Sequence, residues 1–67
     1  MSVAKVIEVS ASSTTSVEDA VRSGLKKVAS TVKGVQGAWV NEIKVQTDAS
    51  GEISEWRVNM RVTFLVE

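Results

Sequence analysis

The sequence contains no cysteine, no histidine and no proline. Without cysteine the chain forms no disulfide, and without cysteine or histidine it offers no thiolate or imidazole ligand for zinc or iron. Only oxygen ligands remain, which suit calcium or magnesium. A domain of 67 residues buries only part of its apolar surface when alone. We therefore expect subunit association to supply the stability that disulfides and metals give other small domains.

An excess of charge of one sign is also lacking. Eight Lys and Arg balance eight Asp and Glu, which gives a formal net charge of zero. Such a chain has no long-range attraction to nucleic acid or to an anionic membrane, so neither is an expected partner. No apolar run approaches the length needed to span a bilayer. Residues 1–5 lack the blocks of a signal peptide, and we expect a cytoplasmic protein.

The first half of the chain predicts a strand, a loop and a helix. Val3–Val9 is short and rich in valine and isoleucine, which predicts a strand, and the polar run Ser10–Thr15 predicts a loop. Thr15 and Glu18 have the spacing of a capping box. Apolar residues then recur at helical spacing, and a glycine suited to a left-handed stop follows. We expect the helix over Ser16–Lys33.

The second half predicts a β-hairpin. Ala38–Gln46 is the first arm, Asp48–Gly51 is the turn, and Ile53–Val66 is the second arm. In the second arm apolar residues alternate with polar ones, so that one face is apolar and covers the helix. The fold class is therefore α+β, a three-stranded antiparallel sheet wrapped around one helix in the order βαββ. Residues 1–67 form a single domain.

The first arm of the hairpin has no cleanly apolar face. Trp39, Asn41, Ile43 and Val45 alternate with Ala38, Val40, Glu42 and Lys44. A β-bulge that shifts the register is one explanation. The simpler interpretation is that the helix covers one face in part and another subunit covers the other. A face that carries Trp39 and Ile43 is too apolar to leave in water, which is a second argument for oligomerisation.

Over essentially its whole length the chain resembles the dodecins. The resemblance is carried by Val3–Val9, by Ser10–Ser16, by Glu18–Val21 and, most specifically, by the last strand, Trp56–Phe64. It implies a hollow spherical homododecamer that binds flavins such as riboflavin, lumichrome or FMN as stacked pairs at subunit interfaces. It also implies a storage or scavenging role that protects the cell from free, photoreactive flavin.

The resemblance also implies site residues. Flavin-binding dodecins carry a Trp early in the second strand that stacks on the isoalloxazine ring. An ungapped comparison places Gly37 at that position, and Trp39 follows two residues later on the same face. The family's second signature is a Gln after an aromatic residue in the third strand, where this chain has Arg57 after Trp56. Arginine has donors only, so Arg57 is expected to bind carbonyl oxygens of the pyrimidine ring or a phosphate.

Each of these residues has a structural alternative. Trp39 either stacks on a planar ligand or fills space between subunits. Arg57 either binds the ligand or forms a salt bridge between subunits. Trp56 lies on the apolar face of its strand and is expected to pack against the helix, as are Met60 and Phe64. The turn that begins at Asp48 lacks the spacing of a calcium-binding loop and is expected to be solvated.

The expected function is flavin binding and sequestration by a homododecamer. Trp39 is the expected stacking platform and Arg57 its polar partner, with Gly37 beside them. The alternative is a dodecin-like assembly that has lost flavin binding and acts as a structural shell, or binds another small molecule or a cation. An enzyme is not expected, because the sequence has no nucleophile–base set and no phosphate-binding glycine loop.

Overall fold

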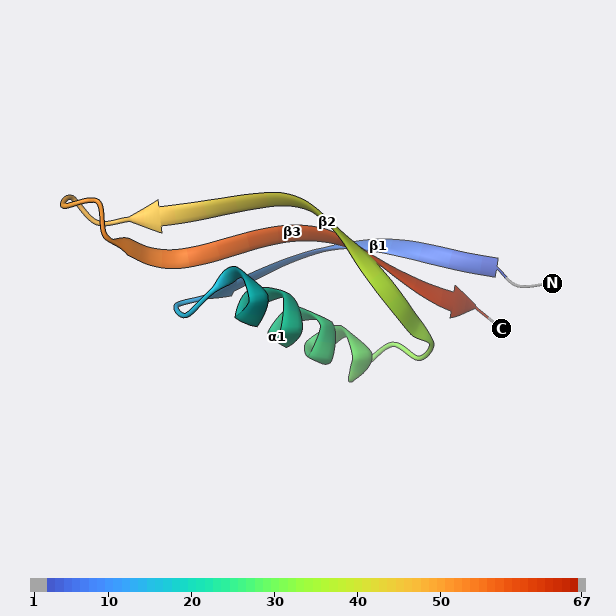
Figure 1. Ribbon diagram of the computed structural model, residues 1–67. Coiled ribbons are helices and arrows are strands. Elements are labelled where there is room, and N and C mark those ends of the chain that lie inside the picture. The colour runs from blue at the N-terminus through green and yellow to red at the C-terminus, as the bar shows by residue number, and fades with distance from the viewer. Residues whose placement is uncertain (1–2, 67) are drawn as a thin grey trace.

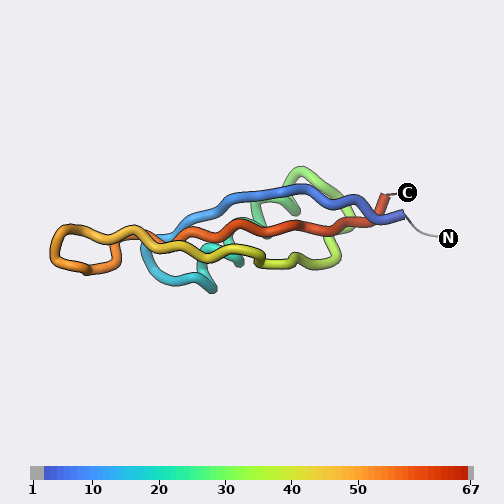
Figure 2. Tube along the Cα trace, turned by 90° about the horizontal axis from the view of Figure 1, so that it is seen from above, coloured from blue at the N-terminus to red at the C-terminus, as the bar shows by residue number. Residues whose placement is uncertain are grey.

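The computed structural model describes residues 3–66, which form one helix and a three-stranded antiparallel sheet. The elements are β1 (Val3–Ser13), α1 (Val17–Ala29), β2 (Val35–Thr47) and β3 (Ile53–Val66). β3 lies in the middle of the sheet, in the order β1-β3-β2. The helix lies against one face of the sheet, and the β2–β3 hairpin extends past it (Figures 1 and 2). The predicted fold class and the βαββ order are confirmed.

Two strands, β1 and β2, are longer than the sequence predicted. β1 continues to Ser13 instead of ending at Val9, because residues 10–13 pair with residues 56–59 of β3. β2 begins at Val35, three residues before the predicted start at Ala38. The serines at positions 10, 12 and 13 have little strand signal of their own, so here pairing with the long central strand determines where β1 ends. The predicted bounds of β3 are confirmed.

The helix begins one residue later than predicted and ends four residues earlier. Ser16 is its N-cap, and the Ser16 Oγ atom accepts a hydrogen bond from the backbone N–H of Asp19 at 2.9 Å. The predicted capping box of Thr15 and Glu18 is therefore wrong. Glu18 instead forms an exposed ion pair with Arg22 at 3.0 Å. After Ala29 the hydroxyl of Ser30 donates to a backbone carbonyl of the last turn, which favours helix termination.

The core lies between α1 and the centre of β3. Its fully buried members are Ala20, Val58, Met60 and Val62. Trp56 and Phe64 share this face of β3 and are half-buried, as the alternation predicts. Gly24 faces the same core and allows the helix to approach the sheet closely. Within residues 3–66 there is no helix long and apolar enough to cross a membrane.

A β-bulge at Asn41 decides which side chains of β2 share a face. Val40 pairs with Met60 and Glu42 pairs with Asn59, which leaves Asn41 as an extra residue. Ile43 then pairs with Val58 on the helix side, whereas Trp39 lies on the opposite side of the sheet. The β-bulge that the sequence left as one explanation is therefore present, and the preferred interpretation, which placed Trp39 and Ile43 on one face, is wrong. The side of the sheet away from α1 is called the open face below.

Candidate functional site

The open face carries polar and aromatic side chains in rows that cross the three strands. Strand pairing gives three successive rows, which are Trp39, Arg61 and Glu8, then Glu42, Asn59 and Ser10, then Lys44, Arg57 and Ser12. Trp39 and Arg57 thus share a face, as the proposed roles require. They do not contact one another within the chain, because two rows of an extended strand span about 13 Å.

Trp39 stands out from the open face with 64% of its surface exposed. Its ring packs against Arg61, whose Cζ atom lies 5.4 Å from the ring centroid in a cation–π contact. Arg61 was not among the site residues predicted from the sequence. The alternation of β3 places Arg57 and Arg61 on one face, but only the register across the bulge shows which of the two faces Trp39.

Gly37 lies on the open face in the row before that of Trp39, opposite Thr63 and on the side of Trp39 away from Arg57. A Cβ atom built on Gly37 would have no neighbour within 4 Å. Packing inside the chain therefore does not require glycine at this position. The missing side chain leaves open space next to the Trp39 row, where a side chain from β2 would otherwise stand.

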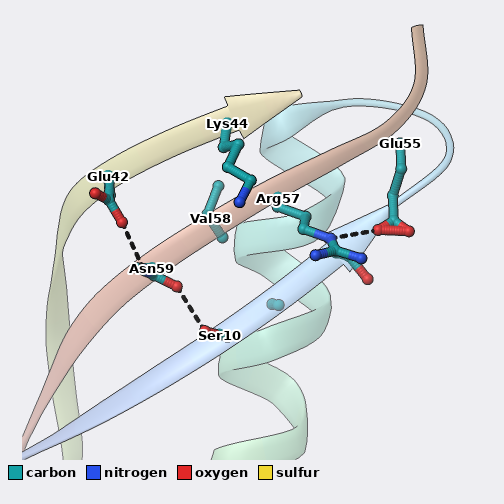
Figure 3. A pocket seen from close by; sticks show the side chains of 9 residues that line it. Ser10, Glu42, Lys44, Glu55, Arg57, Val58 and Asn59 are labelled. Atoms are coloured by element: carbon teal, nitrogen blue, oxygen red, sulfur yellow. Dashed lines mark hydrogen bonds and ion pairs between the residues drawn. The ribbon is translucent and has the colours of Figure 1, made fainter. Parts of the chain in front are cut away.

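Arg57 lines a hollow of about 440 Å³ at the other end of the open face (Figure 3). The lining residues are Ser10, Ala11, Ser12, Glu42, Lys44, Glu55, Arg57, Val58 and Asn59. The Nε atom of Arg57 donates to Glu55 Oε1 at 2.6 Å, so its partner within the chain is a carboxylate of the same strand. Lys44 lies opposite Arg57 on β2. Both signs of charge therefore occur in this hollow.

A hydrogen-bond chain crosses all three strands beside this hollow. Asn59 Nδ2 donates to Glu42 Oε1 at 2.7 Å, and Ser10 Oγ donates to Asn59 Oδ1 at 2.5 Å (Figure 3). These two bonds fix the Asn59 amide in one orientation. They also give Glu42 a partner within the chain, so this carboxylate is part of a network that joins the three strands.

The hairpin turn is organised by one carboxylate. Asp48 Oδ1 accepts hydrogen bonds from the backbone N–H groups of Ser50 and Glu52 and from the Ser50 hydroxyl. These bonds hold the pKa of Asp48 below its ordinary value, and the bond from the Ser50 hydroxyl has the largest effect. Over residues 3–66 no group of three or more acidic side chains is placed to hold a metal ion within one chain.

Comparisons with known proteins agree with this geometry. The family model described as dodecin matches residues 3–67. Among curated proteins, no relative matches the chain.

Three solved structures are similar over nearly all of the chain. The dodecin from Streptomyces davaonensis is 26% identical with a TM-score of 0.91, covering 98% of this chain and 96% of that one. A single-residue mutant of the Thermus thermophilus dodecin is 25% identical with a TM-score of 0.92, covering 100% and 98%. A calcium-chelating antigen of Mycobacterium tuberculosis, described as a calcium dodecin, is 29% identical with a TM-score of 0.82, covering 97% and 91%.

Proposed function

Since the chain is a member of the dodecin family, we propose that it forms a hollow homododecamer that binds and sequesters a flavin such as riboflavin, FMN or lumichrome. The observation that carries this proposal is the exposure of Trp39 on the open face of the sheet. A large aromatic ring with two-thirds of its surface in water offers a flat apolar surface on which a planar ligand can stack. The flavin lies between such rings of neighbouring copies.

Self-assembly is supported by what the single chain leaves exposed. On the open face Trp39 and Val6 are exposed, and on the helix side Ile43 is 59% exposed beyond the reach of the helix. The radius of gyration is 13.8 Å, whereas a compact domain of this length has about 11 Å. An elongated chain with apolar groups on both faces of one hairpin buries them by packing against further copies.

Arg57 is the proposed polar partner at the far end of the same site. The ligand extends along β2 from Trp39 toward the hollow, where the guanidinium of Arg57 donates to carbonyl oxygens or to a phosphate. Gly37 leaves the space beside Trp39 that a stacked ring needs. The protein performs no chemistry on the ligand. An indole stacked on an excited flavin donates an electron, and the return of that electron restores both groups, so that the light energy is lost harmlessly.

A fluorescence titration of riboflavin, FMN and lumichrome with the assembled protein tests this function. We expect saturable quenching that is absent in Trp39→Ala. The matched control is Trp56→Phe, which changes an indole on the helix side of the sheet and keeps the quenching. Light scattering on the same samples is expected to give the mass of twelve chains of 7.2 kDa. A monomer or dimer mass, or no quenching at micromolar protein, overturns the proposal.

Cation binding is the second candidate, favoured by the similarity to the calcium dodecin. Inside one chain the carboxylates of the hollow are engaged, Glu42 by Asn59 and Glu55 by Arg57. A calcium site in this protein would therefore combine carboxylates of several copies. Calorimetric titration of the assembled protein with calcium distinguishes the two functions, because saturable calcium binding without flavin quenching favours the second.

A further inference from the structure

The cation in contact with the proposed stacking platform is Arg61, not Arg57. Arg61 and Trp39 occupy facing positions of β3 and β2, and the Arg61 Cζ atom lies 5.4 Å from the ring centroid. Arg57 lies two rows away along β3, where its Nε atom donates to Glu55. A ligand that stacks on Trp39 therefore meets the guanidinium of Arg61 first.

The donors of Arg61 are available to a ligand. Across residues 3–66, Arg61 forms neither a salt bridge nor a side-chain hydrogen bond, although Glu8 lies opposite it on β1. Its side chain is exposed. A guanidinium presents five N–H donors in a planar fork and stays charged throughout the physiological pH range. When a guanidinium stacks on an indole, its flat face makes the contact, so the N–H donors at its edge can still bind a ligand.

We propose that Arg61 is a specificity-determining residue of the flavin site. Its guanidinium keeps the Trp39 indole in one orientation and donates hydrogen bonds to the acceptor-rich edge of the planar ligand. This inference rests on the proposed flavin-binding function. Because arginine supplies donors and no acceptor, the pair selects planar ligands whose edge carries carbonyl oxygens or an anionic group. It disfavours aromatic ligands without such an edge, which leave the guanidinium without a partner.

The contact also determines where the ligand lies. The Arg61 Cζ atom lies 5.4 Å from the centroid of the Trp39 ring, farther than the separation of about 3.5–4 Å between carbon atoms in contact, so the guanidinium covers only part of the ring. The ligand stacks on the part that Arg61 leaves open, with its edge facing the Arg61 donors. The space left by Gly37 in the neighbouring row extends the room available at the ring. Within one chain the Trp39 ring and the Arg61 guanidinium thus contact the same bound molecule, the ring through stacking and the guanidinium through hydrogen bonds to the ligand edge.

The test compares the dissociation constants of lumichrome, riboflavin and FMN for the assembled wild-type protein and for Arg61→Gln, Arg61→Lys and Arg57→Gln. The matched control is Arg22→Gln, which removes an exposed arginine from the helix, away from the open face. We expect Arg61→Gln to weaken binding at least about ten-fold and Arg22→Gln to change it less than about two-fold. Arg61→Lys keeps the charge but lacks the planar fork, so an intermediate loss is expected.

Comparing the three ligands shows which acceptor Arg61 binds, a ring carbonyl or the phosphate. An equal loss for all three assigns Arg61 to the ring carbonyls that they share, and a larger loss for FMN assigns it to the phosphate. Wild-type affinity in Arg61→Gln, or tighter binding, overturns the inference, because Arg61 then only competes with the ligand for the indole. If Arg61→Gln does not assemble, Arg61→Lys decides, and wild-type affinity in that variant overturns the inference. Absence of flavin binding in the wild type instead removes the proposed function and this inference together.

Discussion

Gly24 of α1 lies directly over Met60 of β3, the largest of the fully buried side chains. A Cβ atom on Gly24 would lie 2.6 Å from Met60 Cε and 2.9 Å from Ala11 Cβ. The end of the Met60 side chain is flexible and can move away. The Cβ atom of Ala11 is fixed to the backbone of β1, so the helix itself would have to shift. The close approach of helix and sheet therefore depends on glycine at this position.

The first prediction is that Gly24→Ala destabilises the protein. Overpacking costs about 1–3 kcal/mol, and the better helix propensity of alanine recovers up to about 1 kcal/mol. Urea denaturation at one fixed protein concentration measures the difference. The control is Ser23→Ala on the exposed side of the same helix, which we expect to be neutral or slightly stabilising. Equal stability of Gly24→Ala and Ser23→Ala would contradict the close packing.

The second prediction concerns the helix cap. Ser16→Ala removes the oxygen that accepts from the Asp19 N–H, and we expect a loss of about 1 kcal/mol of unfolding free energy. Thr15→Ala is the control and is expected to change stability by less than about 0.5 kcal/mol, since Thr15 is exposed and outside the cap. A larger loss from Thr15→Ala than from Ser16→Ala would restore the capping box that the sequence suggested.

Much of the fold follows from patterns that are local in the sequence. The alternation of β3 is regular from Trp56 to Phe64, and the bounds and the core face of this strand were predicted correctly. The helix was predicted from the spacing of its apolar residues. Its cap was misassigned because five hydroxyl residues, Ser12 to Ser16, stand in succession. Which of them caps the helix depends on where β1 ends, and that is set by pairing with β3.

The site was predicted less completely because its geometry depends on pairing between strands. One extra residue, Asn41, moves every later side chain of β2 to the other face. The sequence contains no signal that fixes the position of such a bulge. Trp39 was found because the family resemblance pointed to it. Arg61 was missed because its proposed role in ligand binding depends on the strand register, which places it opposite Trp39.

The third prediction is a pH dependence located in the hairpin turn. The pKa of Asp48 is lowered by hydrogen bonds that its carboxylate accepts, first of all the bond from the Ser50 hydroxyl, because these bonds are stronger while the carboxylate is charged. Its contribution is therefore complete above the ordinary pKa of 3.8 and is lost as the pH falls through the lower pKa of the folded state. Denaturation of the wild type and of Asp48→Asn at pH values from about 5 down to about 2 measures it.

Asparagine accepts the same hydrogen bonds at Oδ1 but does not titrate in this range. We expect the wild type to be the more stable of the two above the ordinary pKa of Asp48, and the difference to shrink as the pH falls. All other carboxylates are the same in the two proteins, so their contributions cancel in the comparison. A difference that stays constant over this pH range would show that the charge of Asp48 does not contribute to the stability of the turn.

The last prediction uses the space beside Trp39. Gly37 has no neighbour within 4 Å of a built Cβ atom, and its φ angle is not positive, so a β-branched residue fits the strand without strain. We expect Gly37→Val to leave the unfolding free energy unchanged or slightly increased. Flavin affinity is expected to fall about ten-fold, because the side chain fills room that the stacked ligand occupies.

Gly37→Ala, with a single added methyl group, is the graded control and is expected to lose less affinity than Gly37→Val. Light scattering separates this effect from a disturbed assembly, because the predicted loss of binding occurs at unchanged mass. A lower mass in Gly37→Val would mean that another copy, and not a flavin, fills the space beside Trp39. Unchanged mass and unchanged affinity would show that the ligand lies elsewhere on the open face and would withdraw Gly37 from the site.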